Sequence, residues 1–435
     1  MQNDTGFKGF ISERAAVREA ERCLDCIDAP CTRGCPAQVD IPRFISRIAQ
    51  RNFKGAAHVL RDGNVLAEIC AFSCSQGEQC EAECCSSKLA HPVRIGALQH
   101  FIAALDRKER LYRPERRTLQ NGPASIAVAG AGPSGISCAH YLYRLGYGVE
   151  IFEKESAPGG IPLTLIPSCR LDPRMAEEEI RNAVDFPEIQ LHCGKPLSAD
   201  ITPQSLLDRG FSAVFIGIGL SSPKLLPMDR PEGVTDGIRF LKQCKNDPDY
   251  TVRGTVVVTG GGNAALDCAV SAVKRGADDV YMLYRRGFVE MPCWWSQKSE
   301  ALFSGVHVLI LTEPARYIPD SRGKLRAVEC RRTALGEKDT SGRRAPEPIP
   351  DSEFELEADI AIEAVGQVPS PETEQFLQEI EHDSRNLIAV SSTLAAGMKG
   401  VFAGGDIVNG GASVVQAVAD GRNAAEQIDR ICSMK

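Results

Sequence analysis

The sequence predicts an α/β protein in which a helical, cysteine-rich N-terminal part precedes two strand–glycine turn–helix–strand units. Three observations lead to this prediction. Nine of the 17 cysteines lie before residue 86, in segments whose apolar residues recur at helical spacing. The stretch GAGPSG at 130–135 follows an apolar strand and opens a helix. The stretch GGGNAA at 260–265 repeats this arrangement farther along the chain, which indicates an internal duplication.

Composition bounds the classes of function. The chain has 435 residues, enough for two or three domains, and its 43% hydrophobic and 25% charged residues are typical of a globular protein. With a net charge of −7 and no long basic tract, we expect no nucleic-acid partner. No run of about eighteen apolar residues predicts a membrane span, and the N-terminus has no apolar signal region. We therefore expect a cytoplasmic protein whose thiols stay reduced.

The N-terminal part is expected to be helical as far as residue 120. The segment SERAAVREAERCL starts with Ser12 as a helix cap, and DIPRFISRIAQRNFKGAAHVLRDG has apolar residues at helical spacing and ends at Gly63. The segment RTLQNGPA at 117–124 is rich in turn formers and predicts the boundary with the α/β part.

The cysteines form two groups. The first, CLDCIDAPCTRGCP at 23–36, has the spacing C-x2-C-x4-C-x3-C and closes with a proline; the second comprises Cys70, Cys74, Cys80, Cys84 and Cys85. A disulfide knot, a zinc site and iron–sulfur clusters are all conceivable. Reduced thiols favour zinc or iron–sulfur, and zinc sites usually pair two C-x2-C hooks across a gap. The Cys-Pro ending is typical of ferredoxins, although the x4 gap is not.

The ferredoxin pattern also predicts how the ligands divide. There the fourth cysteine of a run binds the other cluster. Applied to this chain, Cys35 joins Cys74, Cys80 and Cys84, which leaves Cys23, Cys26 and Cys31 one ligand short.

The first glycine turn predicts a dinucleotide site. Gly130 permits the tight turn, Gly132 lets the backbone approach a pyrophosphate, and Gly135 lets the helix pack closely on the strand. The phosphates would lie at the helix N-terminus, where free N–H groups favour anions. The second strand, VEIFEK, ends in Glu153, an acid that can accept both ribose hydroxyls and repels a 2′-phosphate.

Two further features point to FAD at this first site. The turn SAPGG places Gly159 and Gly160 soon after the acid. Near the C-terminus, VFAGGDIVNGGASVVQAVADGRNAAEQI gives a strand, then Gly404, Gly405 and Asp406, then a helix. An acid at this place can bind the ribityl chain of a flavin.

The second glycine turn carries Gly260, Gly262 and Ala265 in the G-x-G-x-x-A form. Its second strand, DVYMLYRR, ends in Arg285 and Arg286 instead of an acid. Because an arginine fork suits a 2′-phosphate, this unit is predicted to bind NADP(H) in preference to NAD(H). A chain that holds FAD and NADPH has a reason to hold iron–sulfur clusters, since flavin can release singly the two electrons that a hydride delivers.

Ordered motifs along nearly the whole chain resemble the glutamate synthase small-subunit family, which includes the N-terminal half of dihydropyrimidine dehydrogenase. They are CLDC…APC…GCPAQVDIPRFI, CAFSCSQGEQCEAEC, IGALQHF, GAGPSG, PGG, GGGNAALD, YRRG and VFAGGDIVNG. The resemblance implies a helical bis-[4Fe-4S] domain at 1–120, followed by two nested Rossmann-like domains. The FAD domain would comprise 121–222 and 365–435 and enclose an NAD(P)H domain at 223–364.

The resemblance also implies a ligand and a partner. In dihydropyrimidine dehydrogenase a glutamine in an IGxLQ segment completes the three-cysteine cluster, so Gln99 of IGALQ would complete the set of Cys23, Cys26 and Cys31. The chain lacks an N-terminal cysteine nucleophile and a stretch for an FMN barrel, so substrate reduction is expected on a separate, FMN-containing subunit of a hetero-oligomer. Dihydropyrimidine dehydrogenase is the favoured activity, and glutamate synthase is the alternative.

No side chain is expected to act as catalytic acid or base, because hydride transfer between cofactors needs proximity and alignment. Together with the eight metal ligands named above, the residues expected to bind cofactors are, for FAD, Gly130, Gly132, Pro133, Ser134, Gly135, Glu153, Lys154, Gly160, Arg170, Gly405, Asp406, Ser413 and Val414, and, for NADP(H), Gly260, Gly262, Asn263, Ala264, Ala265, Arg285 and Arg286.

Overall fold

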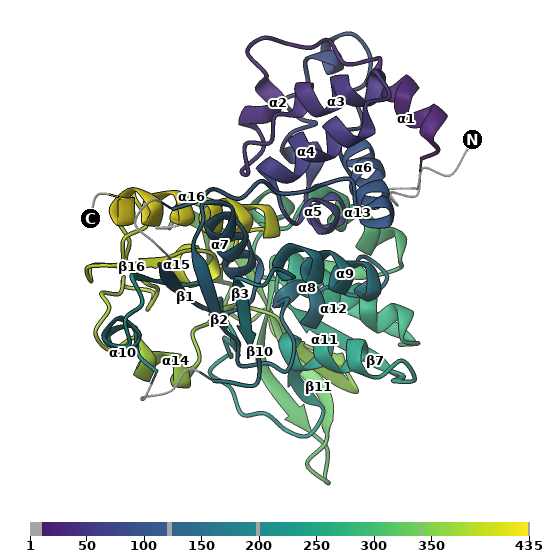
Figure 1. The fold of residues 1–435 in the computed structure, drawn as a ribbon. Helices are drawn as coiled ribbons and strands as arrows, with labels where there is room; N and C mark the ends of the chain where they lie inside the picture. The colour runs from purple at the N-terminus through teal and green to yellow at the C-terminus, as the bar shows by residue number, and fades with distance from the viewer. Residues whose placement is uncertain (1–10, 120–123, 197–200, 340–341, 434–435) are drawn as a thin grey trace. The chain divides into compact units, whose positions relative to one another are not determined.

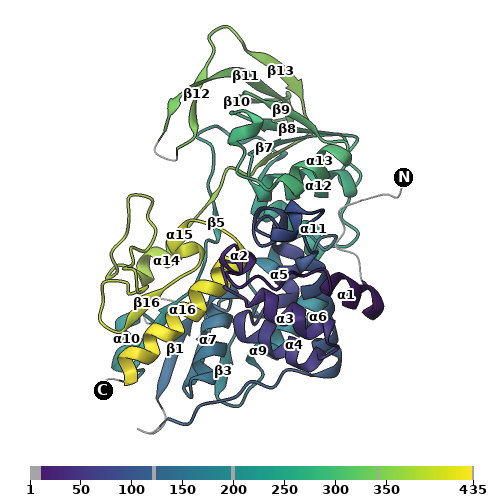
Figure 2. The same cartoon turned by 90° about the horizontal axis from the view of Figure 1, so that it is seen from above.

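The structure is a computed structural model that describes residues 11–119, 124–196, 201–339 and 342–433. The chain divides into two compact units (Figures 1 and 2). The first unit comprises residues 1–163, 169–221 and 369–435, and the second comprises 164–168 and 222–368. The sequence predicts an inserted domain at 223–364, and the longer stretch of the second unit is 222–368.

The cysteine-rich part of the first unit is helical. Its helices are α1 (Glu13–Ala20), α2 (Pro30–Arg33), α3 (Ile41–Ala49), α4 (Phe53–Gly63), α5 (Ala67–Ser73) and α6 (Ile95–Glu109), with 3₁₀ turns η1 (Gln76–Glu78) and η2 (Cys85–Lys88). Ser12, Asp40 and Asn52 cap α1, α3 and α4 by accepting first-turn N–H groups. These helices share one apolar core, against which the thiols of both cysteine groups pack.

The rest of the first unit is a parallel sheet of order β16-β4-β1-β2-β3. Its elements are β1 (Ser125–Ala129), α7 (Pro133–Arg144), β2 (Gly148–Phe152), α8 (Ile161–Thr164), α9 (Pro173–Val184), β3 (Ile189–His192), α10 (Pro203–Asp208), β4 (Ala213–Ile216), α14 (Pro371–Phe376), β16 (Val401–Ala403), α15 (Asp406–Asn409) and α16 (Val414–Ser433). The C-terminal strand β16 pairs with β4, so the two chain stretches of this domain build one sheet. Figure 2 shows α16 beside α7, and Gly421 lets their backbones approach, since a Cβ there would lie 2.1 Å from the Ser134 carbonyl oxygen.

The second unit has a parallel sheet of order β6-β14-β7-β8-β9 and an antiparallel sheet in which β11 pairs with β10, β12 and β13. Its elements are β5 (Ser222–Pro223), β6 (Val234–Asp236), α11 (Gly237–Asn246), β7 (Thr255–Thr259), α12 (Asn263–Lys274), β8 (Asp279–Tyr284), η3 (Phe288–Glu290), α13 (Trp295–Phe303), β9 (His307–Ile310), β10 (Thr312–Pro319), β11 (Leu325–Lys338), β12 (Arg344–Pro348), β13 (Phe354–Glu357), β14 (Ile360–Glu363) and β15 (Gln367–Val368). The internal duplication predicted from sequence is therefore β1–α7–β2 and β7–α12–β8.

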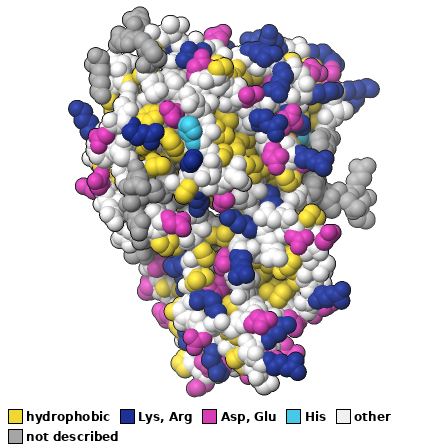
Figure 3. Space-filling model, turned by 60° about the horizontal axis from the view of Figure 1, so that its bottom comes forward, with side chains coloured by type: hydrophobic (Ala, Val, Ile, Leu, Met, Phe, Trp, Pro, Cys, Tyr) yellow, Lys and Arg dark blue, Asp and Glu magenta, His cyan; other side chains and the backbone are white. Residues whose placement is uncertain are grey.

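Two general features of the surface bear on partners. None of the described helices is both long and apolar enough to cross a membrane. On the face drawn in Figure 3, basic and acidic side chains are interspersed and hydrophobic side chains gather in small patches.

Candidate functional site

The first glycine turn lies where β1 meets α7, at the carboxyl edge of the parallel sheet. Gly130 has a φ of +95°, which favours glycine, and its N–H donates to the Phe152 carbonyl at 2.8 Å. A Cβ on Gly135 would lie 1.9 Å from the Gly130 carbonyl oxygen, so only glycine lets the helix begin this close to the turn. These are the roles predicted for both glycines.

Glycines from two other strand ends converge on the same helix N-terminus. A Cβ on Gly217, after β4, or on Gly405, after β16, would lie 2.7 or 2.8 Å from the Ser134 hydroxyl oxygen. A Cβ on Gly160 would lie 2.9 Å from the Gly132 Cα. The ends of β1, β4 and β16 thus form a cradle of bare backbone, which is the place where open α/β sheets bind ligands.

Glu153 follows β2 and is 8% exposed. Its carboxylate accepts N–H groups from Ala131 at 2.6 Å and from Glu155 at 2.9 Å. The acid is therefore fixed against the glycine turn, and each oxygen keeps a lone pair for a ribose hydroxyl. The neighbouring Lys154 is exposed, and Arg170 is half-buried.

Asp406 is the first residue of α15, and Gly405, with a φ of +77°, precedes it. Burial raises the pKa of the Asp406 carboxyl, while the Ala412 N–H donates to it at 3.2 Å. Ser413 caps α16, which begins at Val414, by accepting the Gln416 N–H at 3.2 Å.

Sequence reasoning missed Asp420, whose carboxylate accepts the Gly405 N–H at 2.9 Å and the Gln416 side-chain N–H at 2.9 Å. Asp420 fastens the Gly404–Gly405 turn to α16. The sequence could not predict this role, because an acid one turn after Gln416 on a helix is ordinarily a solvated surface residue.

The second glycine turn lies where β7 meets α12. Gly260 has a φ of +148°, and its N–H donates to the Leu283 carbonyl at 3.0 Å. A Cβ on Gly261 would lie 2.3 Å from the Tyr284 ring, whereas a Cβ on Gly262 would meet no described atom within 4 Å. The space over Gly262 is where the predicted pyrophosphate would approach the backbone.

Other predicted residues of this turn have local roles. Asn263 accepts the Trp294 N–H at 3.0 Å, Ala264 is exposed, and Ala265 is fully buried.

The two arginines after β8 differ in environment. Arg285 is exposed. Arg286 is 5% exposed, donates to the Asp339 carboxylate at 2.5 Å and to the Arg344 carbonyl at 2.7 Å, and so anchors the β11–β12 hairpin. Of the predicted fork, only Arg285 presents its guanidinium to the surface.

A third arginine, Arg343, lies on the same hairpin, where its carbonyl accepts the Asp339 N–H at 2.8 Å. Burial raises the pKa of the Tyr284 hydroxyl, and the side chains of Arg286 and Arg343 oppose that rise by hydrogen bonding to it. Arg343 therefore stands at the end of β8. The sequence could not show this, because Arg343 is 58 residues from Arg285 and reaches it only through the hairpin.

The thiols of the helical part fall into two groups. Cys23, Cys31 and Cys84 lie near enough that charge on Cys23 and Cys84 adds to burial in raising the pKa of Cys31 to about 12. Cys26 lies beside Cys85, which adds to the rise in its pKa. In the other group, Cys35 and Cys74 both raise the pKa of Cys80, after burial.

This grouping differs from the division of ligands expected from the sequence, which stays a prediction. Cys84 was expected with Cys35, Cys74 and Cys80, yet it lies with Cys23 and Cys31. In two-cluster ferredoxins the last cysteine of a run binds the cluster of the other run. If the same holds in both directions here, Cys35 binds with the second run and Cys84 with the first. The Gln99 side-chain N–H donates at 2.6 Å to the Ala67 carbonyl of α5, the helix that leads to Cys74.

The surroundings of the thiols suit clusters. Among the described residues, no three His, Cys, Asp or Glu side chains converge on a single metal ion. Backbone N–H groups of Ala37, Gln38 and Val39 are directed at the Cys35 sulfur and lower its pKa against the effect of burial, and the Val93 N–H donates to the Cys84 sulfur at 3.4 Å. Such N–H···S bonds favour thiolates and tune iron–sulfur clusters.

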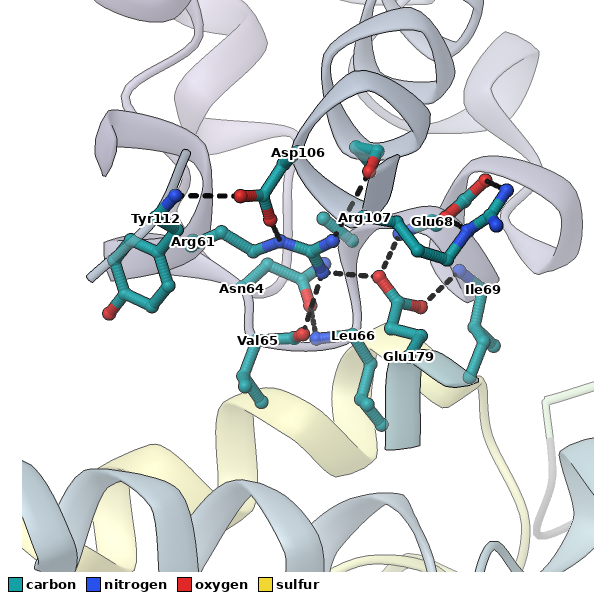
Figure 4. Close-up of polar contacts among 12 residues, drawn as sticks. Arg61, Asn64, Val65, Leu66, Glu68, Ile69, Asp106, Arg107, Tyr112 and Glu179 are labelled. Carbon is teal, nitrogen blue, oxygen red and sulfur yellow. Dashed lines mark hydrogen bonds and ion pairs between the residues drawn. The ribbon is translucent and has the colours of Figure 1, made fainter. Parts of the chain in front are cut away.

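A buried ionic network fastens the helical part to the sheet of the first unit (Figure 4). Glu179 of α9 accepts the N–H groups of Glu68 and Ile69, each at 2.7 Å, and so caps the N-terminus of α5 from another domain. Arg61 of α4 pairs with Glu179 and with Asp106 of α6, the latter at 2.9 Å. Burial opposes the charge on Arg61, but the two carboxylates raise its pKa above the usual value.

Arg107 extends the network by donating to Glu68 and Glu178, each at 2.9 Å. Burial raises the pKa of Glu68 to about 7 despite this partner. Since α5 leads directly to Cys74, the network sets where the second thiol group lies relative to the cradle at β1, β4 and β16.

Comparisons with known proteins agree with this arrangement. Residues 124–421 match the family model of pyridine nucleotide-disulphide oxidoreductases. The chain belongs to that family. Residues 2–111 match the model of dihydropyrimidine dehydrogenase domain II, 4Fe-4S cluster. The chain is therefore an NAD(P)H-dependent FAD and iron–sulfur oxidoreductase.

Individual relatives cover different shares of their own length. The chain is 35% identical over 431 residues to the NADP(+)-dependent formate dehydrogenase subunit beta of Moorella thermoacetica, covering 93% of this chain but 60% of the relative. It is 32% identical over 416 residues to the NAD-dependent dihydropyrimidine dehydrogenase subunit PreT of Escherichia coli, covering 95% and 93%. Among solved structures, FprA of Mycobacterium tuberculosis in complex with NADPH has a TM-score of 0.60 at 17% identity, covering 72% of this chain and 85% of that chain, which shows a common fold.

Proposed function

We propose that this chain is the electron-input subunit of a dihydropyrimidine dehydrogenase, which oxidises NADPH and delivers electrons to a separate FMN-containing subunit. The observation that carries the proposal lies in the first compact unit. There a backbone cradle with a fixed acid, Glu153, belongs to the same unit as two groups of thiols that pack on the helical core. When bound, FAD accepts a hydride from nicotinamide and releases its electrons singly to iron–sulfur clusters. The near-complete match to PreT in both directions supports the pyrimidine assignment.

Each part of the chain contributes positioning in this proposal. The turn at Gly130–Gly135 and the α7 N-terminus hold the FAD pyrophosphate, Glu153 the adenosine ribose, and Asp406 the ribityl chain. One cluster is held by Cys23, Cys26, Cys31 and Cys84, and the other by Cys35, Cys74, Cys80 and Gln99. The soft thiolate donors and the N–H groups directed at Cys35 fit this assignment.

The coenzyme is proposed to be NADPH. No acid follows β8 to repel a 2′-phosphate, and the exposed Arg285 together with Arg343 supplies cations beside Tyr284. Arg286 supports this site by holding the hairpin that carries Arg343.

The test is anaerobic affinity purification of the tagged chain from its native host. We expect an FMN-barrel protein to co-purify, and the pair to couple NADPH oxidation to uracil or thymine reduction. A brown protein with flavin absorbance, reduced by NADPH, confirms the electron-input half of the proposal. A partner with no FMN barrel, or a pair that leaves pyrimidines unchanged, contradicts the assignment of the activity.

A second candidate follows from the relative with the higher identity. A formate dehydrogenase beta subunit shares 35% of aligned residues with this chain, so the chain could exchange electrons between NADP(H) and a formate-oxidising subunit. Formate-dependent NADP+ reduction by the co-purified complex distinguishes this candidate from the first.

A further inference from the structure

Two adjoining hollows open on the helical part of the first unit, each with a volume of about 470 Å³. Asp40, Arg43 and Arg47 line both of them. The second hollow is also lined by Cys26 and Ile27, so it lies against the first group of thiols. These shared walls make one continuous surface, which we call the Arg43–Arg47 face.

The two arginines are one helical turn apart on α3. The opposite side of α3 is buried through Ile41, Phe44 and Ile48, so Arg43 and Arg47 must project outward. Neither is in an ion pair with any acidic side chain that the structure describes.

Three other arginines of the helical part are in ion pairs. Arg22 pairs with Glu19, Arg33 with Asp28, and Arg51 with Glu13. The one acid shared by both hollows, Asp40, uses a carboxylate oxygen to cap α3 at the Arg43 N–H, at 3.3 Å. Arg422, in the first hollow, donates to the carbonyls of Ala37 and Gly63. Arg43 and Arg47 thus form no ion pair beside a thiol group, although Asp62 lines the first hollow and Asp25 the second.

Apolar side chains surround the same thiols. Leu24 is 52% exposed and Ile27 fully exposed, on either side of Cys26. Leu89, 76% exposed, comes four residues after Cys85, at the end of η2, and the Cys85 thiol lies beside that of Cys26. Single exposed apolar residues are ordinary, but three around one thiol group next to two unpaired arginines have the composition of an interface with a polar rim.

We propose that the Arg43–Arg47 face docks the electron-accepting partner through a carboxylate-bearing surface of that partner, which packs on Leu24, Ile27 and Leu89. The inference rests on the proposed function and names the face through which electrons leave. The arginines would steer an acidic surface to the thiols, and covering the apolar side chains would exclude water where the two redox centres meet. Asp25, which lines the second hollow, would set the register by repelling misplaced carboxylates.

The test reverses the two charges in Arg43→Glu/Arg47→Glu. The matched control is Arg14→Glu/Arg18→Glu, an exposed pair with the same spacing on α1 that lines neither hollow. The probe is the partner chain isolated with the tagged protein, and stopped-flow measures its reduction at low and high salt. We expect the Arg43/Arg47 variant to react about tenfold or more slowly than wild type at low salt, with the gap closing at high salt, and the control within about twofold.

Two further readouts keep the inference distinct from the proposed function. Reduction of ferricyanide by NADPH and the iron content should match wild type in both variants, which shows that flavin and clusters are in place. If wild type itself fails to reduce the partner, the proposed function fails first. Equal slowing by both variants, no dependence on salt, or a change only in self-association measured by analytical ultracentrifugation would overturn the docking inference.

Discussion

The two strand–turn–helix–strand units have the same plan but differ at three places. In both, the strand that leads into the glycine turn is the central strand of a parallel sheet, and the strand after the helix pairs with it on one side. The central strand is β1 in the order β16-β4-β1-β2-β3 and β7 in the order β6-β14-β7-β8-β9. The last position of the G-x-G-x-x-G pattern is Gly135 in one and Ala265 in the other. The second strand is followed by Glu153 in one and by Arg285 and Arg286 in the other. The first unit also fastens a helical part through α9, where the second has an antiparallel sheet.

This comparison separates what is generic from what is specific. Strand order and the tight turn at Gly130 or Gly260 recur, because any pyrophosphate needs a bare backbone at a helix N-terminus. We expect the charge after the second strand to set which dinucleotide each unit binds. We expect the position of the thiol groups to depend on what packs beside the first unit, where Glu179 caps α5 and pairs with Arg61.

The largest effect is expected from Glu179→Gln, which removes the feature that the second unit lacks. It leaves Arg61 with one carboxylate and weakens the cap of α5; breaking a buried pair costs about 3–5 kcal/mol. We expect a lower midpoint in urea unfolding and slower electron transfer from reduced flavin to the clusters. Glu177→Gln, an exposed neighbour on α9, is the control, and equal behaviour of the two variants would show that the network does not hold the domains together.

Exchanging glycine and alanine at the last position of the two motifs, Gly135 and Ala265, tests this difference directly. In Gly135→Ala the new Cβ would lie 1.9 Å from the Gly130 carbonyl oxygen, so α7 must shift, at the upper end of about 1–3 kcal/mol. We expect purified protein with much less flavin absorbance. Ala265→Gly should cost only about 1 kcal/mol of helix stability and leave flavin content unchanged. Full flavin content in Gly135→Ala would contradict this prediction, because it would mean that the turn accommodates a Cβ at residue 135.

Glu153→Gln removes the charge that distinguishes the first unit. The amide keeps one acceptor, so the Ala131 or Glu155 N–H loses a charged partner and the ribose loses a strong acceptor. Hydrogen bonds to charged groups are worth about 1.5–3 kcal/mol, which predicts FAD binding weaker by about tenfold or more. Titration of the flavin-free variant with FAD measures this loss, and an unchanged affinity would remove Glu153 from the site.

Much of this architecture was accessible from the sequence. The fold class, the duplicated unit and the FAD and NAD(P)H family followed from glycines at fixed spacing after apolar strands. Such patterns are local, and steric demands of the turn leave few alternatives.

What the sequence could not give depends on contacts between distant segments. The thiols that lie near Cys84 depend on how the segments around η2 pack, not on spacing within a run. The anchoring of Arg286 requires the β11–β12 hairpin, and the cap that Glu179 provides joins residues 110 apart or more. Each of these is set by tertiary packing, which no periodicity records.

The smallest effects are expected where the second unit selects its coenzyme. Arg285→Gln should raise the KM for NADPH by about tenfold, because one charged contact to the 2′-phosphate is lost, while the KM for NADH stays unchanged. Arg343→Gln should raise the KM for NADPH by a few-fold in the same selective way, since this arginine reaches the end of β8 only through the hairpin.

Arg286→Gln is the informative contrast to both variants. It frees the hairpin from Asp339 and Arg344, so it should lower thermal stability and impair both coenzymes together. Steady-state kinetics with NADPH and NADH, measured with ferricyanide as acceptor, separates the two patterns. A selective loss of NADPH in Arg286→Gln with unchanged stability would restore the arginine fork of the sequence prediction, whereas a general loss would leave Arg285 and Arg343 as the residues that read the phosphate.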